Sequence, residues 1–269
     1  MADRSTLVRA TLRSVAVLYL SFLLVIPVAL IFFRTFENGV GPVIDGLTSP
    51  ATIHAFQITG VVAFYAVIAN TVFGVATAIL LVRHDFRGKR VLNALIDLPL
   101  AVSPVIVGLA LILVYGSTTG VGRALAGAGI QVIFSIPGMV MATIFVCIPL
   151  VVRAVAPVLE EIGDEQEQAA MTLGSGPVQT FLRITLPSIR GALAYGVVLA
   201  LARSLGEYGA VAVVSGRLVG RTQTVTLLVQ ERYLNFDQET AYACALLLVV
   251  TAVVALIISR LLAPKEIFR

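Results

Sequence analysis

Long runs of apolar residues without a single charge constrain this chain more than any other feature of its sequence. Five such runs occur, over residues 14–33, 58–82, 98–122, 124–152 and 240–259. A sixth run, 191–216, has the same length but contains Arg203 and Glu207. Each run is close to or above the roughly 20 residues that an α-helix needs to cross the hydrocarbon core of a bilayer. We therefore predict six membrane-spanning helices.

The composition supports a membrane protein and excludes two other classes. Hydrophobic residues make up 58% of the chain and charged residues 13%, against roughly a quarter charged in soluble domains. The runs are apolar throughout, whereas the strands of a membrane β-barrel alternate apolar and polar residues. A soluble helical core would need polar helix faces, which these runs lack. No linker or fixed-period repeat divides the chain, so we predict one all-α transmembrane domain over residues 1–269.

The basic residues cluster in a way that predicts the orientation in the membrane. Three groups flank the predicted spans: Arg4, Arg9 and Arg13; Arg83, Arg87, Lys89 and Arg90; and Arg260, Lys265 and Arg269. Loops rich in Lys and Arg stay in the cytoplasm, so both termini are predicted to be cytoplasmic. One loop is an exception to this rule. With six spans and a cytoplasmic N-terminus, the loop after the fifth span lies outside the cytoplasm, yet it contains Arg217, Arg221 and Arg232.

Several kinds of chemistry are missing from the sequence. There is no GxxxxGK(S/T) phosphate loop, no GxSxG and no HExxH. With only His54 and His84, no His-rich metal site can form, and Cys147 and Cys244 lie in predicted spans as apolar packing residues. The net charge of +4 resides in the loops that flank the spans rather than in a nucleic-acid-binding patch. We therefore predict a non-catalytic protein that binds no metal, cofactor or nucleic acid.

One polar segment, residues 168–187, interrupts the apolar chain and reads QAAMTLGSGPVQTFLRITLP. Ile162, Ala169 and Leu173 fall close to one stripe at helical spacing, which gives a first helix a partly apolar side. Gly174 stands where a helix C′ residue would, and Gly176 and Pro177 fit the N-cap and first position of a second helix.

The predicted second helix has an apolar face of its own. It is formed by Val178, Phe181 and Leu182 at helical spacing. A dense acidic patch, formed by Glu160, Glu161, Asp164, Glu165 and Glu167, precedes this segment, and its simplest alternative interpretation is a solvated helix face. We predict two short helices joined by a Gly corner, in a cytoplasmic loop at about 157–190 that presents a docking surface.

This segment resembles the EAA loop of bacterial ABC-importer permeases, EAA-x3-G-x9-I-x-L-P. The matching positions are Ala169, Ala170, Gly174, Ile184, Leu186 and Pro187, and the departure is Gln168 in place of the usual Glu. The resemblance implies a type I importer (MetI-like) permease fold and a loop that docks on a cytoplasmic ATPase, which holds ATP and Mg. The docking residues it implies are Glu165, Gln168, Ala169, Ala170, Leu173, Gly174, Val178, Phe181, Ile184, Leu186 and Pro187.

The sixth apolar run contains two residues of opposite charge at a spacing that allows an ion pair. Arg203 and Glu207 lie one turn apart on a predicted helix face. Ionisable residues in a span face each other or a cavity. The pair therefore either stabilises the bundle by neutralising itself, or Arg203 and Ser204 line the path of an anion, since a planar guanidinium suits oxyanions.

Two stretches resemble a narrower family. Residues 202–224 are similar to the RxxGE(F/Y)GA region of sulfate and molybdate permeases, and residues 97–108 are similar to permease subunits of sulfate/thiosulfate importers. This implies an anion path at Ser103, Arg203, Ser204 and Glu207. It also implies a bacterial inner-membrane complex with a second permease, an ATPase dimer and a periplasmic sulfate-binding protein. A molybdate or tungstate permease and a self-sufficient secondary transporter or channel remain alternatives.

Overall fold

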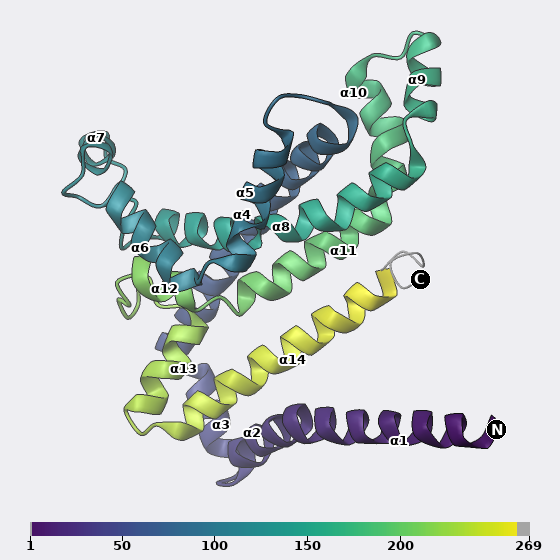
Figure 1. Ribbon diagram of the computed structural model, residues 1–269. Helices are drawn as coiled ribbons and strands as arrows, with labels where there is room; N and C mark the ends of the chain where they lie inside the picture. Colours follow the sequence, from purple (N-terminus) through teal and green to yellow (C-terminus); the bar gives the residue numbers. More distant parts are fainter. Residues whose placement is uncertain (1, 263–269) are drawn as a thin grey trace.

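The computed structural model describes residues 2–262, and all regular secondary structure in this range is helical (Figure 1). The N-terminal elements are α1 (Ala2–Leu20), the π-helical turn η1 (Ser21–Val25), α2 (Ile26–Phe36), α3 (Val40–Thr48), α4 (Pro50–Arg83), α5 (Lys89–Ala101), α6 (Pro104–Tyr115) and α7 (Gly120–Gly127). The C-terminal elements are α8 (Ile136–Ile162), α9 (Glu165–Thr172), α10 (Pro177–Thr180), the π-helical turn η2 (Phe181–Thr185), α11 (Leu186–Leu205), α12 (Gly209–Val214), α13 (Val225–Leu234) and α14 (Gln238–Leu262).

Five continuous helices among the described residues are long and apolar enough to cross a membrane. They cover Thr11–Phe36, Pro50–Arg83, Ile136–Ile162, Pro177–Leu205 and Gln238–Leu261. The bent pair α5 and α6 makes six if it counts as one span. The predicted spans 14–33, 58–82 and 240–259 are confirmed, because each lies inside one of these helices.

The prediction of one helix over 98–122 is wrong. The chain turns by 114° between α5 and α6, and α6 ends at Tyr115. Proline restricts the residue before it to extended conformations, and Ser103 before Pro104 has φ −59 and ψ 133. The sequence therefore breaks the apolar run at a point that hydropathy alone does not reveal.

The fourth predicted run, 124–152, begins too early. Its first residues belong to α7, and the long helix α8 begins at Ile136. The intervening segment contains two residues with positive φ, Gly129 at 78° and Phe134 at 60°. These residues carry no charge, so the apolar run continues in the sequence where the helix does not.

Helix α8 lies at the centre of the bundle, between α4 and α11. Two glycines allow the close approach: a Cβ on Gly74 of α4 would lie 2.8 Å from the Cβ of Val151, and one on Gly196 of α11 would lie 3.0 Å from that of Ala154. Small residues bring membrane helices into close contact, where van der Waals packing holds them. Buried Val152, Val155 and Leu159 of α8 extend this contact toward α9.

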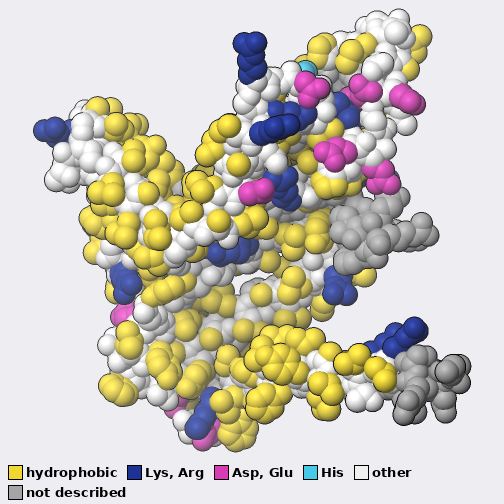
Figure 2. Space-filling view, in the orientation of Figure 1, with side chains coloured by type: hydrophobic (Ala, Val, Ile, Leu, Met, Phe, Trp, Pro, Cys, Tyr) yellow, Lys and Arg dark blue, Asp and Glu magenta, His cyan; other side chains and the backbone are white. Residues whose placement is uncertain are grey.

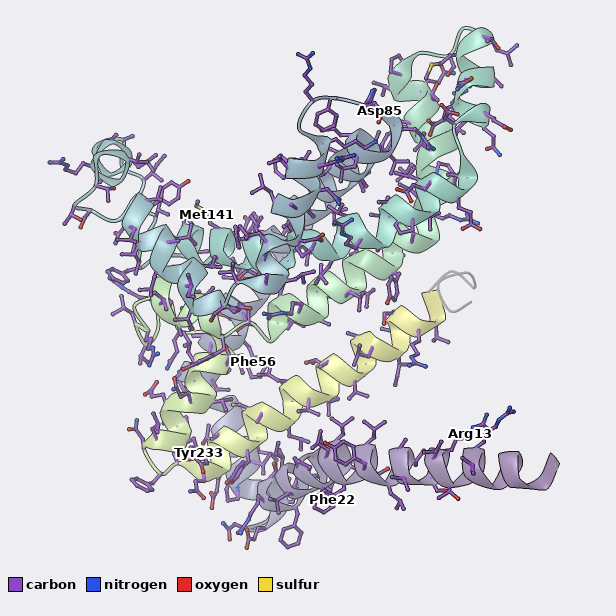
Figure 3. The ribbon with its side chains drawn as sticks, viewed as in Figure 1. Arg13, Phe22, Phe56, Asp85, Met141 and Tyr233 are labelled. Atoms are coloured by element: carbon purple, nitrogen blue, oxygen red, sulfur yellow. The ribbon has the colours of Figure 1, made fainter. Side chains whose placement is uncertain are left out.

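The N-terminal part of the first span stands apart from the rest of the chain, whereas α2 packs against α14. Helix α1 projects away from the bundle in Figure 1, and Phe22 is an exposed residue on η1 (Figure 3). Figure 2 shows hydrophobic side chains over much of the visible surface. Both ends of the described chain lie toward the side of α9 and α10, whereas α3, α7 and α13 lie toward the other. Of the basic residues that predict topology, Lys265 and Arg269 lie outside the described residues.

Candidate functional site

The predicted docking segment forms a sharp corner of the chain, residues 163–187, which we call the α9–α10 corner. Helix α8 ends at Ile162, Gly163 has a φ of +62°, and α9 begins at Glu165. Glu165 and Glu167 occupy the first turn of α9, where the helix dipole favours negative charge. The predicted apolar stripe is wrong, because Gly163 separates Ile162 from the helix that carries Ala169.

Gly174 ends α9 as predicted. Its φ is +86°, a conformation in which a side chain is strained. The Gly174 N–H donates to the Met171 carbonyl at 3.0 Å, and the Ser175 N–H donates to the Ala170 carbonyl at 3.0 Å. These are the two hydrogen bonds of a Schellman motif, and they fix the direction in which the chain leaves α9.

The second helix of the corner begins as predicted, with Gly176 as N-cap and Pro177 in the first turn. It is not short, however, because it runs through η2 and α11 as one 29-residue helix to Leu205. Pro187 cannot donate a backbone hydrogen bond to the carbonyl four residues earlier, and the widened turn η2 lies just before it. The corner is therefore the start of a span rather than a separate pair of helices.

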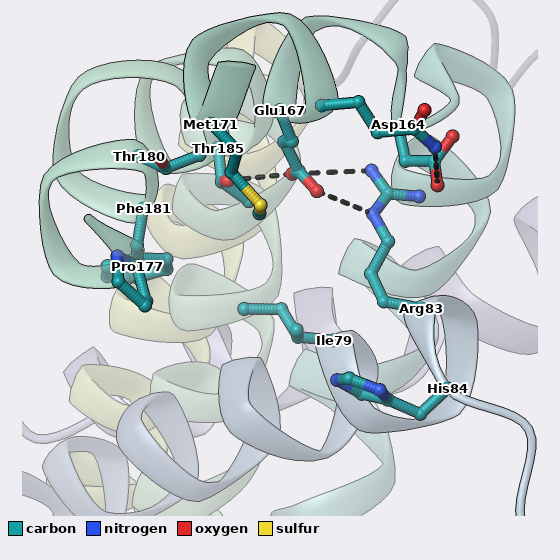
Figure 4. A pocket seen from close by; sticks show the side chains of 11 residues that line it. Ile79, Arg83, His84, Asp164, Glu167, Met171, Pro177, Thr180, Phe181 and Thr185 are labelled. Atoms are coloured by element: carbon teal, nitrogen blue, oxygen red, sulfur yellow. Dashed lines mark hydrogen bonds and ion pairs between the residues drawn. The ribbon is translucent and has the colours of Figure 1, made fainter. Parts of the chain in front are cut away.

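An arginine from a distant helix holds the α9–α10 corner in place (Figure 4). Arg83, at the end of α4, donates from Nη1 to the Leu159 carbonyl at 2.8 Å and from Nη2 to the Gly163 carbonyl at 2.6 Å. Its Nε donates to Glu167 Oε2 at 3.0 Å, and Glu167 Oε1 accepts a hydrogen bond from Thr185 Oγ1 at 2.7 Å. One side chain thus ties together α4, the end of α8, and α9, and through Glu167 the start of α11.

The sequence prediction missed this clamp. It treated Arg83 only as a charge that orients the chain and Glu167 only as part of an acidic patch. The two residues are 84 positions apart, so no local spacing links them. Arg83 and Glu167, the two residues of this clamp, border a cavity of about 510 Å³ between the end of α4 and the corner. The wall of the cavity is also lined by Ile79, His84, Met171 and Phe181 (Figure 4).

The tip of the corner presents apolar side chains to solvent. Leu173 is 90% exposed and Val178 is 72% exposed. The predicted docking residues divide into two groups. Glu165, Gln168, Ala169, Leu173, Gly174, Val178 and Pro187 are exposed, whereas Ala170, Phe181, Ile184 and Leu186 are partly buried. An exposed apolar tip is typical of a surface that another protein covers.

The structure gives a reason for Gln168. Its Nε2 donates to Asp164 Oδ2 at 2.8 Å, one turn earlier. A glutamate at this position would place a second carboxylate against Asp164, and like charges at this spacing destabilise a helix. The Gln168 amide therefore donates a hydrogen bond to Asp164 where a glutamate would repel it.

The loop between α4 and α5 contains a local ion pair next to the corner. Lys89 Nζ, at the start of α5, donates to Asp85 Oδ1 at 2.8 Å. This hydrogen bond and the lysine charge lower the pKa of the Asp85 carboxyl. The Asp85 side chain is 97% exposed, so the pair contributes little to stability.

The second candidate site is the break between α11 and α12. The prediction of a continuous helix through Glu207 is wrong, because α11 ends at Leu205 and α12 begins at Gly209. The ion pair itself is present, with Arg203 Nη1 2.6 Å from Glu207 Oε2. Glu207 Oε1 also accepts a hydrogen bond from the Ala210 N–H at 2.9 Å. The buried carboxylate thus satisfies an unpaired donor at the start of α12.

The predicted path residues occupy different environments. Ser204 is buried, donates to the Ala200 carbonyl at 2.7 Å, and contacts Cys147 Sγ of α8 at 3.4 Å. Its hydroxyl therefore faces the interior of this chain. Ser103 is exposed at the α5–α6 break. A Cβ on Gly209 would lie 3.0 Å from Pro104 Cβ, so the two breaks in the helices pack against each other.

Among the described residues, no group of three His, Cys, Asp or Glu side chains could hold a metal ion. Cys147 and Cys244 are free and buried, as expected for apolar packing residues.

Comparison with known proteins gives a family and several relatives. The model of the family described as "Binding-protein-dependent transport system inner membrane component" matches residues 70–267. The sulfate transport system permease protein CysW of Synechocystis sp. is 44% identical, over 96% of this chain and 94% of the relative. The Escherichia coli CysW is 41% identical over 92% and 85% of the two chains. The CysT permease of Salmonella typhimurium is 36% identical over 86% and 83%.

A solved structure has the same fold. The crystal structure of a bacterial alginate ABC transporter in complex with its periplasmic protein contains a chain that matches with a TM-score of 0.74 at 20% identity. The match covers 97% of this chain and 93% of the other. The all-α ABC-importer permease fold predicted from the sequence is confirmed.

Proposed function

We propose that this chain, which belongs to the family of binding-protein-dependent transport system inner membrane components, is a permease subunit of an ATP-driven sulfate importer. The observation that carries the proposal is its 44% and 41% identity to proteins named as sulfate transport system permeases, along nearly the whole chain. The same protein is expected to accept thiosulfate, whose charge and tetrahedral shape are those of sulfate.

The comparisons also support a distinct second permease in the complex. This chain is 41–44% identical to the CysW relatives named above but 36% identical to CysT. The two relatives carry different names within a sulfate transport system. We therefore propose that a CysT-like chain completes the path, and that lipid and this partner together cover the exposed first span.

The α9–α10 corner is the proposed contact with an ATPase dimer, which binds ATP and Mg on behalf of the complex. The exposed Leu173 and Val178 supply the apolar contact. Arg83 supplies the connection to the bundle, because its hydrogen bonds join α9 to α4 and to the end of α8. A displacement of the corner by the ATPase would then move the central helix rather than a loose loop.

Orientation follows from the side on which the corner lies. Both described ends of the chain lie toward that side (Figure 1), and Arg9, Arg13 and Arg260 are near those ends. We place this side in the cytoplasm, by the excess of Lys and Arg. The opposite side, with α3, α7 and α13, then faces the periplasm and receives the sulfate-binding protein.

Radiolabelled uptake tests the function in a bacterial strain that lacks this subunit and regains it from a plasmid. We expect the plasmid to restore ATP-dependent sulfate uptake. The matched control carries Gly174→Val and should reach the membrane without restoring uptake. Restored molybdate uptake with unchanged sulfate uptake would instead identify a molybdate permease. Transport by the purified chain on an ion gradient, without an ATPase, would identify a secondary transporter.

A further inference from the structure

The central helix α8 contains an arginine, Arg153, within its membrane span. Arg153 is the only charged residue of α8 before Glu160. At 1.5 Å per residue it lies about 14 Å from the Ile162 end of the helix, within the half of the span next to the α9–α10 corner. Although α8 is the central helix, the Arg153 side chain is 39% exposed.

The guanidinium of Arg153 is held along one edge by α5. Its Nε donates to Asp97 Oδ1 at 2.8 Å and its Nη2 donates to Asp97 Oδ2 at 2.5 Å. Nη2 also donates to Asn93 Oδ1 at 2.9 Å. Among the described residues Nη1 has no hydrogen-bond partner. The arginine is thus fixed in direction while one nitrogen stays free to donate.

Arg153 borders a cavity of about 470 Å³ between α5, α8 and α11. Pro149 and Pro157, one turn on either side of Arg153, lie in the same wall, and Tyr195 and Leu199 of α11 face them. Pro157 has no N–H, so the carbonyl of Arg153 lacks its usual helical hydrogen bond. The Tyr195 hydroxyl has no hydrogen-bond partner among the described residues. Arg153 and Tyr195 are therefore the residues with polar side chains in a wall that is otherwise lined by apolar residues.

The Arg153–Asp97 pair is partly exposed, and exposure of charged side chains to lipid is energetically unfavourable. Ionisable side chains within spans face the bundle interior or a water-filled cavity, and both Asp97 and Arg153 are about two-fifths exposed, at 45% and 39%. The pair therefore indicates water on this face of α5 and α8. Arg203 differs, because its Nη1 is already engaged by the buried Glu207.

We propose that Arg153 contacts the transported oxyanion on the corner side of the path, through Nη1, while Asp97 keeps the other edge of the guanidinium. The proposal rests on the proposed function for the identity of the anion. A dianion receives a charge-assisted hydrogen bond from Nη1, and the nearby Asp97 carboxylate repels it. The result is a weak contact from which the anion leaves readily. Because Arg153 is on the helix that continues into the corner, a movement of the corner also moves this contact.

Cysteine labelling of the assembled transporter in liposomes tests this site. Both native cysteines are first replaced by alanine, and Leu199→Cys then places one thiol in the cavity wall. Relative to the rate of each reagent with a free thiol in solution, we expect a methanethiosulfonate reagent that carries a sulfonate to react roughly tenfold faster than one that carries a trimethylammonium group, because the arginine concentrates anions in the cavity. Sulfate should slow the reaction.

Variants of the pair show whether the arginine causes the preference. Arg153→Gln should remove the preference for the sulfonate reagent, and Asp97→Asn should increase it. The control Leu113→Cys lies on the outer surface of α6, with Leu113 77% exposed, and should react with neither reagent. ATPase activity of each complex and its elution as a single species establish that it is assembled.

Three results would overturn the proposal. The Leu199→Cys thiol could react as slowly as Leu113→Cys, which would mean that lipid or the partner permease fills the cavity. It could react with both reagents equally, or keep its preference in Arg153→Gln. The identity of the anion is tested separately: an Arg153-dependent preference that molybdate protects and sulfate does not would keep this site and overturn the sulfate assignment.

Discussion

Two acid–arginine pairs in this chain differ in how far apart their residues lie in the sequence. They are Glu167–Arg83 at the corner and Glu207–Arg203 at the break between α11 and α12. Glu167 pairs with a residue 84 positions away, whereas Glu207 pairs with a residue four positions away. Both side chains of the first pair are mostly buried, at 12% and 14% exposed. In the second pair Glu207 is 1% exposed and Arg203 is 40% exposed.

The separation of the paired residues determines which parts of the molecule each pair connects. The Arg83 pair joins three helices, so a movement of one is passed to the others. The Arg203 pair lies within one short segment and satisfies the start of α12 through the Ala210 N–H, so it stabilises a local break. The first pair is suited to coupling and the second to structure.

Removal of Arg203 should have the largest effect on stability. Arg203→Leu leaves the Glu207 carboxylate buried and unpaired, which costs about 3–5 kcal/mol of unfolding free energy. We expect little assembled complex in the membrane and a lower melting temperature in detergent. The double variant Arg203→Leu/Glu207→Gln should recover much of the loss, because it buries no charge. Normal melting with lost sulfate flux would instead place Arg203 in the path.

Removal of Arg83 should cost less stability but should uncouple the transporter. Arg83→Met removes the hydrogen bonds to Glu167 and to the Leu159 and Gly163 carbonyls. The cavity of about 510 Å³ beside Arg83 and Glu167 can admit water to the groups left behind, so we expect a loss of about 2 kcal/mol. The decisive measurement is the number of sulfate ions transported per ATP hydrolysed, which should fall. Arg87→Met, at an exposed arginine of the next loop, is the control and should leave this ratio unchanged.

A side chain at Gly174 should have a smaller effect on stability. Gly174→Val forces a β-branched residue into a φ of +86°, at a cost of about 1–2 kcal/mol. It should also redirect the corner and reduce transport more than it reduces the amount of protein. The control is Gly176→Ala, since Gly176 has a φ of −75°. Equal transport by the two variants would show that the Schellman turn does not set the direction of the corner.

Replacement of Leu173 should leave stability unchanged and affect docking alone. The side chain is 90% exposed, so Leu173→Asp removes no internal contact. We expect the same melting temperature and a weaker association of the ATPase, measured by co-purification. Gln166→Glu adds the same charge at another exposed position of α9 and should bind the ATPase normally. Undiminished co-purification with Leu173→Asp would exclude the apolar tip as the contact.

Much of this architecture could be predicted because membrane helices and glycine turns are local properties. Three predicted spans lie within observed helices, and the Gly174 turn and the Gly176–Pro177 helix start are as expected. Two of the errors occur where apolar residues continue through a break without a charge to mark it. At Ser103 and at residues 128–135, backbone geometry ends the helix although hydropathy does not change.

Three of the spans, the α9–α10 corner and the presence of the Arg203–Glu207 pair could be inferred from sequence alone, because each depends on residues within a few turns of one another. The packing of the helices, by contrast, sets three contacts: Ser204 faces α8, Arg83 clamps the corner, and Asp97 holds Arg153 beside a cavity. These contacts join helices that are 56 to 84 positions apart. The partner of a charge at that separation is chosen by how the helices pack, and no spacing in the sequence encodes it.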